Sequence, residues 1–459
     1  MYIHDNFYKK LAIEKIDGNF VDYKYTSYES AAIIDTVTQQ KIHLKTIIKD
    51  ESYYLLGYIG DSDEKKNNFF KSFKLKTPKY KKFKTVVDTS LHFSVLTNTK
   101  QPAIRSSYGR YQTDKKAYDQ EKKYISYTSK SNEKVFVQRM KYHDLQMFHN
   151  IDSLRNAIER NYEYKFVIED KKYEDKDDIY ASTYVLKDTA SAKRVYRKNI
   201  LKQGVLFSLS TLEDSIAERS EFVKNFYDTF TPKDTLLGKD VFADKTDIFF
   251  EGIKNNDSIV LKAYAKIKFD DKHANTIISL LKEHDFPEDR ETIKNYLISS
   301  LGKLENDRIH PFFEELYVEA YDKPKTQNAI LKSLLQQKDE ASYKMVLKLL
   351  EKDFPLDSRG TSRLFKTGKN NLALKKELFP ELLQYSTIQE YKAPIYQLLT
   401  QLTDSSLLKP KSYKRYKSQL LNDAKIEIKR NLGKSSSYNY KSSTAVPYTH
   451  LRAHETLMN

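Results

Sequence analysis

An internal repeat constrains the fold of this chain more than any other feature. Shifting the sequence by 153 positions, the separation of Asp35 and Asp188, brings residues 35–73 onto residues 188–226 without a gap. Many apolar positions of the two stretches coincide, for example Leu56 with Leu209 and Phe69 with Phe222. A shared register of this length is hard to obtain by accident, so we predict a duplicated module.

The second copy predicts an antiparallel sheet with helices. Alternating apolar and β-branched residues are typical of half-buried strands. Asp152 or Ser153 is expected to cap a helix. Phe222, Phe226 and Phe230 follow at four-residue spacing, which indicates one helix face packed against the sheet. The predicted strands lie at residues 91–96, 124–127, 134–140, 164–168, 180–186, 193–200 and 205–209.

The first copy begins too late to be complete. In the shared register its opening strands and first helix would precede Met1, so we expect the chain to start inside a domain. We also expect residues 1–75 to pack less well than the second copy, with Phe69 and Phe73 in the core. The last residues, 447–456, resemble a sequencing-adapter read-through peptide, and residues 435–459 are predicted to be a disordered or artefactual tail.

From about residue 240 the hydrophobic period becomes helical. Ile259, Val260, Ala263, Tyr264 and Ile267 share one helical face, and Asp257 or Asn256 can cap that helix. Four prolines fit first-turn positions: Pro287, Pro311, Pro324 and Pro394. Further helices are predicted near residues 272–285, 288–302, 310–321, 325–337, 339–353, 371–385, 388–403 and 411–430.

One internal similarity suggests how these helices are arranged. Residues 280–287 are similar to residues 349–355, and Phe286 and Phe354 are 68 positions apart, a distance that fits two helix pairs. Stacked helix hairpins make a HEAT-like α-solenoid, and a compact helical bundle is the alternative. The predicted fold class is therefore α+β followed by all-α. Its parts are a truncated α+β module at 1–80, a complete α+β module at 81–235, a helical repeat array at 240–432 and the tail at 435–459.

Composition limits the chemistry. The chain has 459 residues and no cysteine, which excludes disulfide scaffolds, thiolate metal sites and cysteine nucleophiles. The net charge is +16, and most of the basic excess is lysine. Such an excess is typical of a solvated surface, or it attracts polyanions such as nucleic acid or acidic glycan. No apolar run is long enough to predict a membrane-spanning helix.

Two basic, aromatic-rich stretches are candidate polyanion sites. Residues 65–84 hold nine lysines and no acidic residue, interleaved with phenylalanine and tyrosine, and residues 409–417 form a second patch. The alternative is a basic linker beside a buried helix face. The candidate binding residues are Lys65, Lys66, Lys79, Lys81, Lys82, Lys84, Lys411, Lys414, Arg415 and Lys417.

The sequence predicts no catalytic, cofactor-binding or metal-binding residue. It contains no Walker loop, dinucleotide-binding glycine pattern, zincin motif or nucleophile elbow. His143, Asp144 and His149 lie close together, but their spacing favours structural or solvent-facing roles. The acidic residues from Glu169 to Asp178 lack the glycine turn of a calcium loop and are predicted to form a solvated hairpin tip.

Several helical segments resemble the C-terminal part of large bacterial TraB/GumN-family proteins. The resemblance rests on residues 312–317, 329–335, 377–383, 391–399 and 423–429, and extends more weakly through the α+β modules. The catalytic domain of that family is proposed to be a metal-dependent hydrolase with a glycine-to-histidine motif, and nothing in this chain matches that motif. The resemblance therefore implies a non-catalytic accessory region, from an envelope or exported parent protein.

We predict a non-catalytic binding or scaffold region of a larger protein, with an unidentified protein or peptide as its partner. One alternative is polyanion binding through the two basic patches. The other is an unrecognised hydrolase that uses His143 and neighbouring carboxylates. The expected location is the cell envelope or periplasm if the parent protein is exported, and the cytoplasm otherwise.

Overall fold

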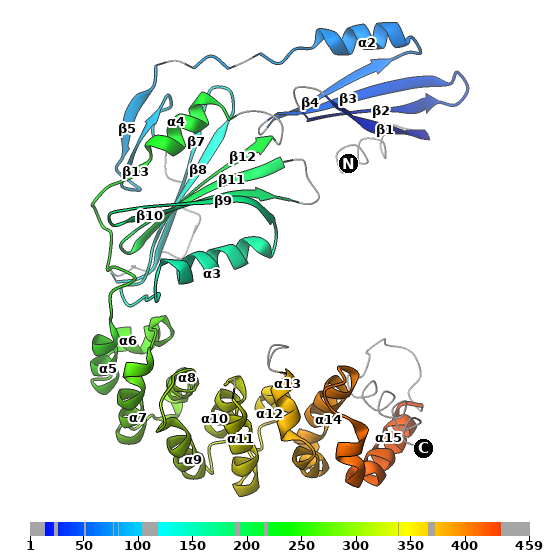
Figure 1. Cartoon of the computed structure of the whole chain (residues 1–459). Helices are drawn as coiled ribbons and strands as arrows, with labels where there is room; N and C mark the ends of the chain where they lie inside the picture. Colours follow the sequence, from blue (N-terminus) through cyan, green and yellow to red (C-terminus); the bar gives the residue numbers. More distant parts are fainter. Residues whose placement is uncertain are drawn as a thin grey trace. The chain divides into compact units, whose positions relative to one another are not determined.

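The computed structural model describes residues 14–22, 26–49, 52–76, 78–80, 82–102, 118–188, 193–214, 219–337, 339–365 and 372–432. The chain divides into two compact units, Met1–Lys245 and Thr246–Asn459. The first unit is rich in antiparallel β-strands and the second is helical (Figure 1). The predicted order of an α+β region followed by an all-α region is confirmed. The predicted tail at 435–459 lies outside the described residues.

The first sheet is an antiparallel meander of four strands followed by a helix. Its elements are β1 (Glu14–Asp22), β2 (Thr26–Asp35), β3 (Gln40–Lys49), β4 (Ser52–Ile59) and α2 (Asp63–Ser72), with the strands in the order β1-β2-β3-β4. Among the described side chains, Ala32 and Leu44 form a small buried cluster on this sheet. Ser62 caps α2, since its side chain accepts a hydrogen bond from the Lys65 amide.

The expected core of this helix is wrong by one position. Phe69 is 43% exposed and Phe70 is the buried ring. The cap at Ser62 fixes which helix positions face the sheet, and Phe73 follows the helix as its C-cap residue. The Phe69 ring instead lies 6.5 Å from the Tyr58 ring, and the Phe73 ring lies 5.5 Å from the Tyr54 ring.

The second sheet has six antiparallel strands in the order β7-β8-β12-β11-β10-β9. Three short strands form a separate sheet in the order β13-β6-β5. The strands are β5 (Lys84–Asp88), β6 (Phe93–Thr97), β7 (Glu121–Thr128), β8 (Lys134–Lys141), β9 (Val167–Lys176), β10 (Ile179–Lys187), β11 (Lys193–Lys202), β12 (Val205–Asp214) and β13 (Thr231–Pro232).

One face of the six-stranded sheet packs against helix α4 (Glu221–Thr229) and the small sheet. Phe222, Phe226 and Phe230 are buried there, together with Phe93 and Phe207. The Phe93 ring stacks on Phe230 with 4.5 Å between ring centroids. The prediction that this aromatic stripe belongs to the core is confirmed.

Helix α3 (Ile151–Glu163) covers part of the opposite face, over β9 and β10. The predicted caps, Asp152 and Ser153, are wrong. Asn150 is the N-cap, and Ser153 completes a capping box with it because each side chain accepts from the backbone of the other residue.

The start of β9 was also predicted too early. A helix runs to Glu163, so the strand expected at 164–168 begins at Val167 and ends at Lys176. Most of the acidic cluster therefore lies along an exposed edge strand. Asp177 and Asp178 form the turn, with Asp177 at φ 54°, so the hairpin tip is confirmed for these two residues alone.

The second unit consists of helices joined by short loops. They are α5 (Thr246–Lys254), α6 (Ser258–Ala263), η1 (Tyr264–Lys266), η2 (Asp271–His273), α7 (Ala274–Glu283), η3 (Glu288–Arg290), α8 (Glu291–Leu301), α9 (Ile309–Glu319), α10 (Pro324–Gln336), α11 (Glu340–Lys352), α12 (Ser358–Leu364), α13 (Leu372–Lys375), η5 (Lys376–Leu378), η6 (Glu381–Thr387), α14 (Gln389–Asp404), η7 (Pro410–Tyr416) and α15 (Lys417–Leu432). None of the described helices has both the length and the apolar character that crossing a bilayer requires.

Most helix predictions hold, and two are corrected. Asp257 caps α6 and Pro324 opens α10, as predicted. The helix expected at 371–385 is broken into α13, η5 and η6 around Pro380, whose ring removes a backbone donor. Pro394 lies inside α14 and not in its first turn.

The central helices form two layers (Figure 1). Helices α8, α10, α12 and α14 contact one another in series, and α7, α9, α11 and α13 form the second series. Each hairpin joins a helix of one series to a helix of the other. Loops therefore lie at two opposite edges of the layers.

Candidate functional site

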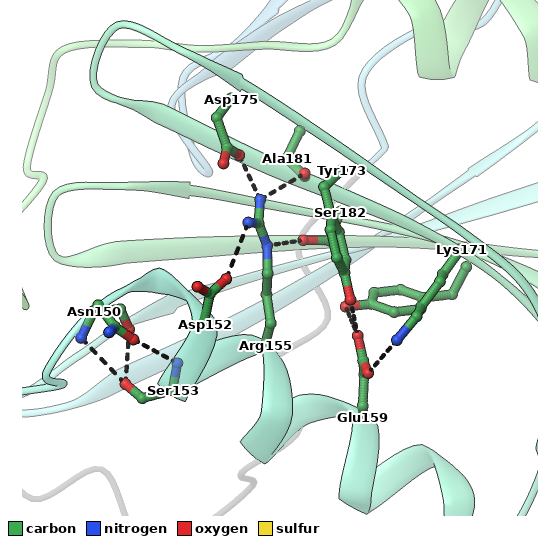
Figure 2. Close-up of polar contacts among 11 residues, drawn as sticks. Asn150, Asp152, Ser153, Arg155, Glu159, Lys171, Tyr173, Asp175, Ala181 and Ser182 are labelled. Carbon is green, nitrogen blue, oxygen red and sulfur yellow. Dashed lines mark hydrogen bonds and ion pairs between the residues drawn. The ribbon is translucent and has the colours of Figure 1, made fainter.

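A network of hydrogen bonds and ion pairs connects α3 to the six-stranded sheet. Figure 2 shows Arg155 and Glu159 projecting from the helix toward the strands. The Arg155 side chain is buried and donates to the Ser182 hydroxyl over 3.1 Å and to the Ala181 carbonyl over 3.3 Å. It also forms an ion pair with Asp175, and its guanidinium lies 4.2 Å from the centre of the Tyr173 ring. This arginine is therefore held by strands β9 and β10.

Glu159, one turn further along α3, is the second anchor. Its carboxylate accepts from Lys171 over 2.9 Å, from Tyr184 over 3.2 Å and from Tyr173 (Figure 2). Burial by itself raises the pKa of Glu159, but the hydrogen bonds from Tyr173 and Lys171 outweigh it and hold the pKa below its usual value. The Glu159 carboxylate is ionised, and both of its oxygens accept hydrogen bonds from protein side chains. This arrangement favours a structural role.

Among the described residues, the same sheet face is uncovered where α3 does not lie over it. A cavity of about 780 Å³ lies over β7, β8, β12 and β11. Strand pairing sets Phe136, Ser210 and Arg197 side by side in one row across three strands. The next row contains Tyr124, Gln138 and Ser208. The cavity is therefore lined by rows of hydroxyl, amide and aromatic groups, with Arg197 at one end and Lys134 as a second cationic residue.

Arg197 stands at the border between the covered and the open parts of this face. Its guanidinium lies 5.3 Å from the centre of the Tyr162 ring, near the end of α3. The Nε atom is buried and donates to no acceptor, and Arg197 forms no ion pair or hydrogen bond with any residue that the structure describes. Arg139, Arg155 and Arg194 on the same sheet assembly each have an acidic partner.

The helical unit exposes apolar side chains along one edge. We define the aromatic edge as the loops 284–290, 320–323 and 353–357 with the residues that flank them, all at the junctions that lead into α8, α10 and α12. Tyr321 is 75% exposed and Leu356 is 59% exposed, and Val318 and Phe354 are also exposed. Tyr317 donates to the Asp353 carbonyl over 2.8 Å, which ties two of these loops together.

Polar contacts between successive helix pairs recur at a nearly constant separation. Lys282 pairs with Glu315, 33 positions away, and Lys325 pairs with Glu291, 34 positions away. Lys348 with Glu314 and Arg415 with Glu381 repeat the separation of 34. These pairs form a ladder along the array.

The predicted polyanion residues fall in both units. Lys65 and Lys66 lie on α2, Lys79 and Lys82 lie in the following segment, and Lys84 opens β5, whereas Lys81 lies outside the described residues. Lys66 forms an ion pair with Asp63 at 2.6 Å. Lys411, Lys414 and Arg415 lie in η7 and Lys417 opens α15, and Arg415 forms an ion pair with Glu381.

The histidines of the hydrolase alternative lie in one loop but in different surroundings. His143 is buried, and its Nδ1 accepts from the Leu145 amide over 3.0 Å. His149 is exposed, and Asp144 pairs with Lys141 at 2.8 Å. Within the part of the chain that the structure describes, no three His, Cys, Asp or Glu side chains are grouped as a metal site.

Sequence reasoning missed both Arg197 and the α3 network. The sequence offers little signal for Arg197, because it lies beside Lys198 in a strand with several other basic residues. No protein-family model matches this chain. The curated proteins likewise contain no significantly similar sequence.

Proposed function

We propose that this chain is a binding region whose helical unit docks a protein partner along the aromatic edge. The observation that carries the proposal is the exposure of Val318, Tyr321, Phe354 and Leu356 at neighbouring helix junctions. Aromatic and aliphatic side chains that remain exposed together are typical of protein interaction sites. The proposed region is non-catalytic.

We further propose that the helical unit is a HEAT-like solenoid. The two series of helices support this, because each pair contacts its neighbours in sequence order. The ladder of ion pairs at separations of 33 or 34 residues supports it too. This spacing is half of the 68 positions between Phe286 and Phe354. A repeating array presents equivalent junctions in a row, which suits an extended partner.

The duplicated module is part of the same proposal. Adding 153 to the bounds of β3 gives 193–202, which are the bounds of β11. The pairing of Lys45 with Leu56 in the first sheet corresponds to that of Lys198 with Leu209 in the second. Equal strand bounds and equal hairpin register support a common origin of the two meanders. The resemblance to TraB/GumN-family proteins stays a prediction on which the binding proposal does not depend.

Selection of peptides from a phage-displayed random library on the full chain tests the docking edge. The comparison uses wild type, Tyr321→Ser/Leu356→Ser, and Lys303→Ser/Lys332→Ser as a control with two exposed sites away from this edge. We expect the selected peptides to contain aromatic or aliphatic residues. Their affinity for the Tyr321/Leu356 variant should fall at least about tenfold, which corresponds to about 1.4 kcal/mol.

The control variant should bind these peptides like wild type. Peptides that bind all three proteins equally, or a library that yields no binder dependent on Tyr321 and Leu356, would refute the aromatic edge as the docking site. Circular dichroism of each variant shows whether the helices are intact.

A further inference from the structure

We propose that the open face of the six-stranded sheet binds a small organic anion that carries a ring. Its acidic group would contact Arg197, and its ring would lie against Phe136 and Tyr124. This site lies in the first unit and is independent of the protein-docking edge proposed above.

The size of the cavity fits a small molecule. A volume of about 780 Å³ falls within the range of ligand pockets, which run from about 300 to about 1,000 Å³. Phe136 and Arg197 are both paired with Ser210 and are therefore two strand spacings apart. That separation is about 10 Å. An aromatic ring with an acidic substituent can contact both side chains across it.

The lining combines apolar surface with hydrogen-bonding groups. Phe136 is 45% exposed and Tyr124 is 36% exposed, and both side chains line the cavity. Ser126, Ser208 and Ser210 and Gln138 lie between the rings and the guanidinium. Rings provide apolar contact, and hydroxyl and amide groups orient a polar ligand.

The positive charge of Arg197 favours an anionic ligand. A guanidinium offers donors in a planar fork that matches a carboxylate or a phosphate. Arg197 lines the cavity, and its guanidinium has no acceptor among the residues that the structure describes. An anion that accepts from the cavity side of this guanidinium therefore has no acceptor from the described residues to displace.

Arginines with a structural role in this unit have hydrogen-bond or ion-pair partners in the protein. Arg155 has Asp175, Ser182 and the Ala181 carbonyl as partners, and Arg194 has Glu169. Arg197 has only the ring of Tyr162, which leaves its hydrogen-bonding capacity unused among the described residues. Arg194 and Arg197 lie three residues apart on one strand, β11, and only Arg194 has an acidic partner that the structure describes.

Fluorine NMR titration of the full chain tests the proposal with three probes that share a 4-fluorophenyl ring. 4-Fluorobenzoate and 4-fluorophenyl phosphate carry the two candidate acidic groups, and 4-fluorobenzamide is the neutral control. The proteins are wild type, Arg197→Gln, Arg197→Lys and Arg194→Gln. Arg194 is the matched control because it lies on the same strand three residues away, on the other face of the sheet.

We expect saturable binding of at least one anionic probe to wild type and to Arg194→Gln. Arg197→Gln should weaken that binding about tenfold or more, and Arg197→Lys should weaken it less because a point charge remains. The benzamide should bind weakly and equally to all four proteins. The preferred anion decides between a carboxylate ligand and a phosphate ligand.

Three results would overturn the proposal. One is the absence of saturable binding of either anion to wild type, and another is equal affinity for benzamide and the anions. The third is a loss of binding in Arg194→Gln as large as in Arg197→Gln. Matching circular dichroism spectra of the variants exclude misfolding as the cause of a loss.

Discussion

At the scale of single residues, the charged side chains at the six-stranded sheet differ in whether they have hydrogen-bonding partners. Glu159 and Arg155 are surrounded by partners, which is the condition under which a charge is tolerated inside a protein. Arg197 lines the cavity and has no acceptor among the described residues. We infer that the first arrangement holds α3 in place and that the second arrangement is available to a ligand.

Glu159 gives a prediction at this scale. Its folded pKa is lowered, because hydrogen bonds from Tyr173 and Lys171 outweigh the effect of burial. Such a carboxyl stabilises the fold above its unfolded pKa of about 4.3, and this contribution is lost as pH falls through the lower folded pKa. Glu159→Gln should therefore destabilise the α3 region by about 1.5–3 kcal/mol at pH 7 and flatten its acid dependence. Hydrogen exchange of residues 151–176 between pH 7 and pH 3 measures both effects.

Glu163→Gln is the control for this prediction, because Glu163 is exposed in the same helix. It should change neither the protection of α3 at pH 7 nor its dependence on pH. If both variants behave alike, the hydrogen bonds to Glu159 do not stabilise the helix.

At the scale of elements, helix packing in the array depends on close approach at small residues. Gly302 ends α8, and a β-carbon placed there would lie 2.5 Å from the Ser333 β-carbon of α10. Gln337 also donates to the Gly302 carbonyl over 3.2 Å. The φ angle of Gly302 is −66°, so steric contact and not backbone conformation requires glycine at this position.

A pair of substitutions tests this contact. Gly302→Ala should destabilise the helical unit by about 1–3 kcal/mol, because overpacking displaces α10. Ser333→Gly should cost about 1 kcal/mol for glycine inside a helix. In the double variant the removal of the Ser333 β-carbon relieves the clash, so its loss should be smaller than the sum of the two. Urea unfolding followed by circular dichroism measures the difference, and strict additivity would show that the two residues do not interact.

At the scale of the whole molecule, the excess of positive charge is spread over both units. The net charge is +16, and the predicted basic patches lie on α2 and its following segment and on η7 with α15. Two of the candidate side chains, Lys66 and Arg415, have acidic partners at 2.6 Å and 3.5 Å. Their attraction for a polyanion is correspondingly reduced.

Heparin chromatography in a salt gradient tests polyanion binding. If the patches bind, the variant Lys411→Gln/Lys414→Gln/Arg415→Gln/Lys417→Gln should elute at lower salt than wild type and show a smaller salt dependence. Lys282→Gln/Lys325→Gln/Lys344→Gln/Lys348→Gln is matched in charge, and each of its lysines has an acidic partner. Equal shifts in both variants would indicate a general effect of charge, and no retention of wild type at low salt would dispose of the polyanion alternative.

The sequence by itself determined the features that depend on near neighbours. The stripe of Phe222, Phe226 and Phe230, the cap at Asp257 and the first-turn Pro324 follow from the helical period and from local hydrogen bonds. Where three polar residues compete for one cap position, the prediction was wrong: Asn150 caps α3 in place of Asp152 or Ser153. The burial of Phe70 in place of Phe69 is a similar one-residue error, since it depends on the helix start.

Only the tertiary structure decided which groups meet across the sheet. The rows that line the cavity join residues of β7, β8, β12 and β11, and their pairings bring Phe136 and Arg197 to one row through Ser210. Likewise, Glu159 finds its donors on β9 and β10, and Gly302 meets Ser333 on another helix. Hydrophobic period and capping act over a few residues and can be seen in the sequence, whereas strand order and helix packing join distant residues through the fold as a whole.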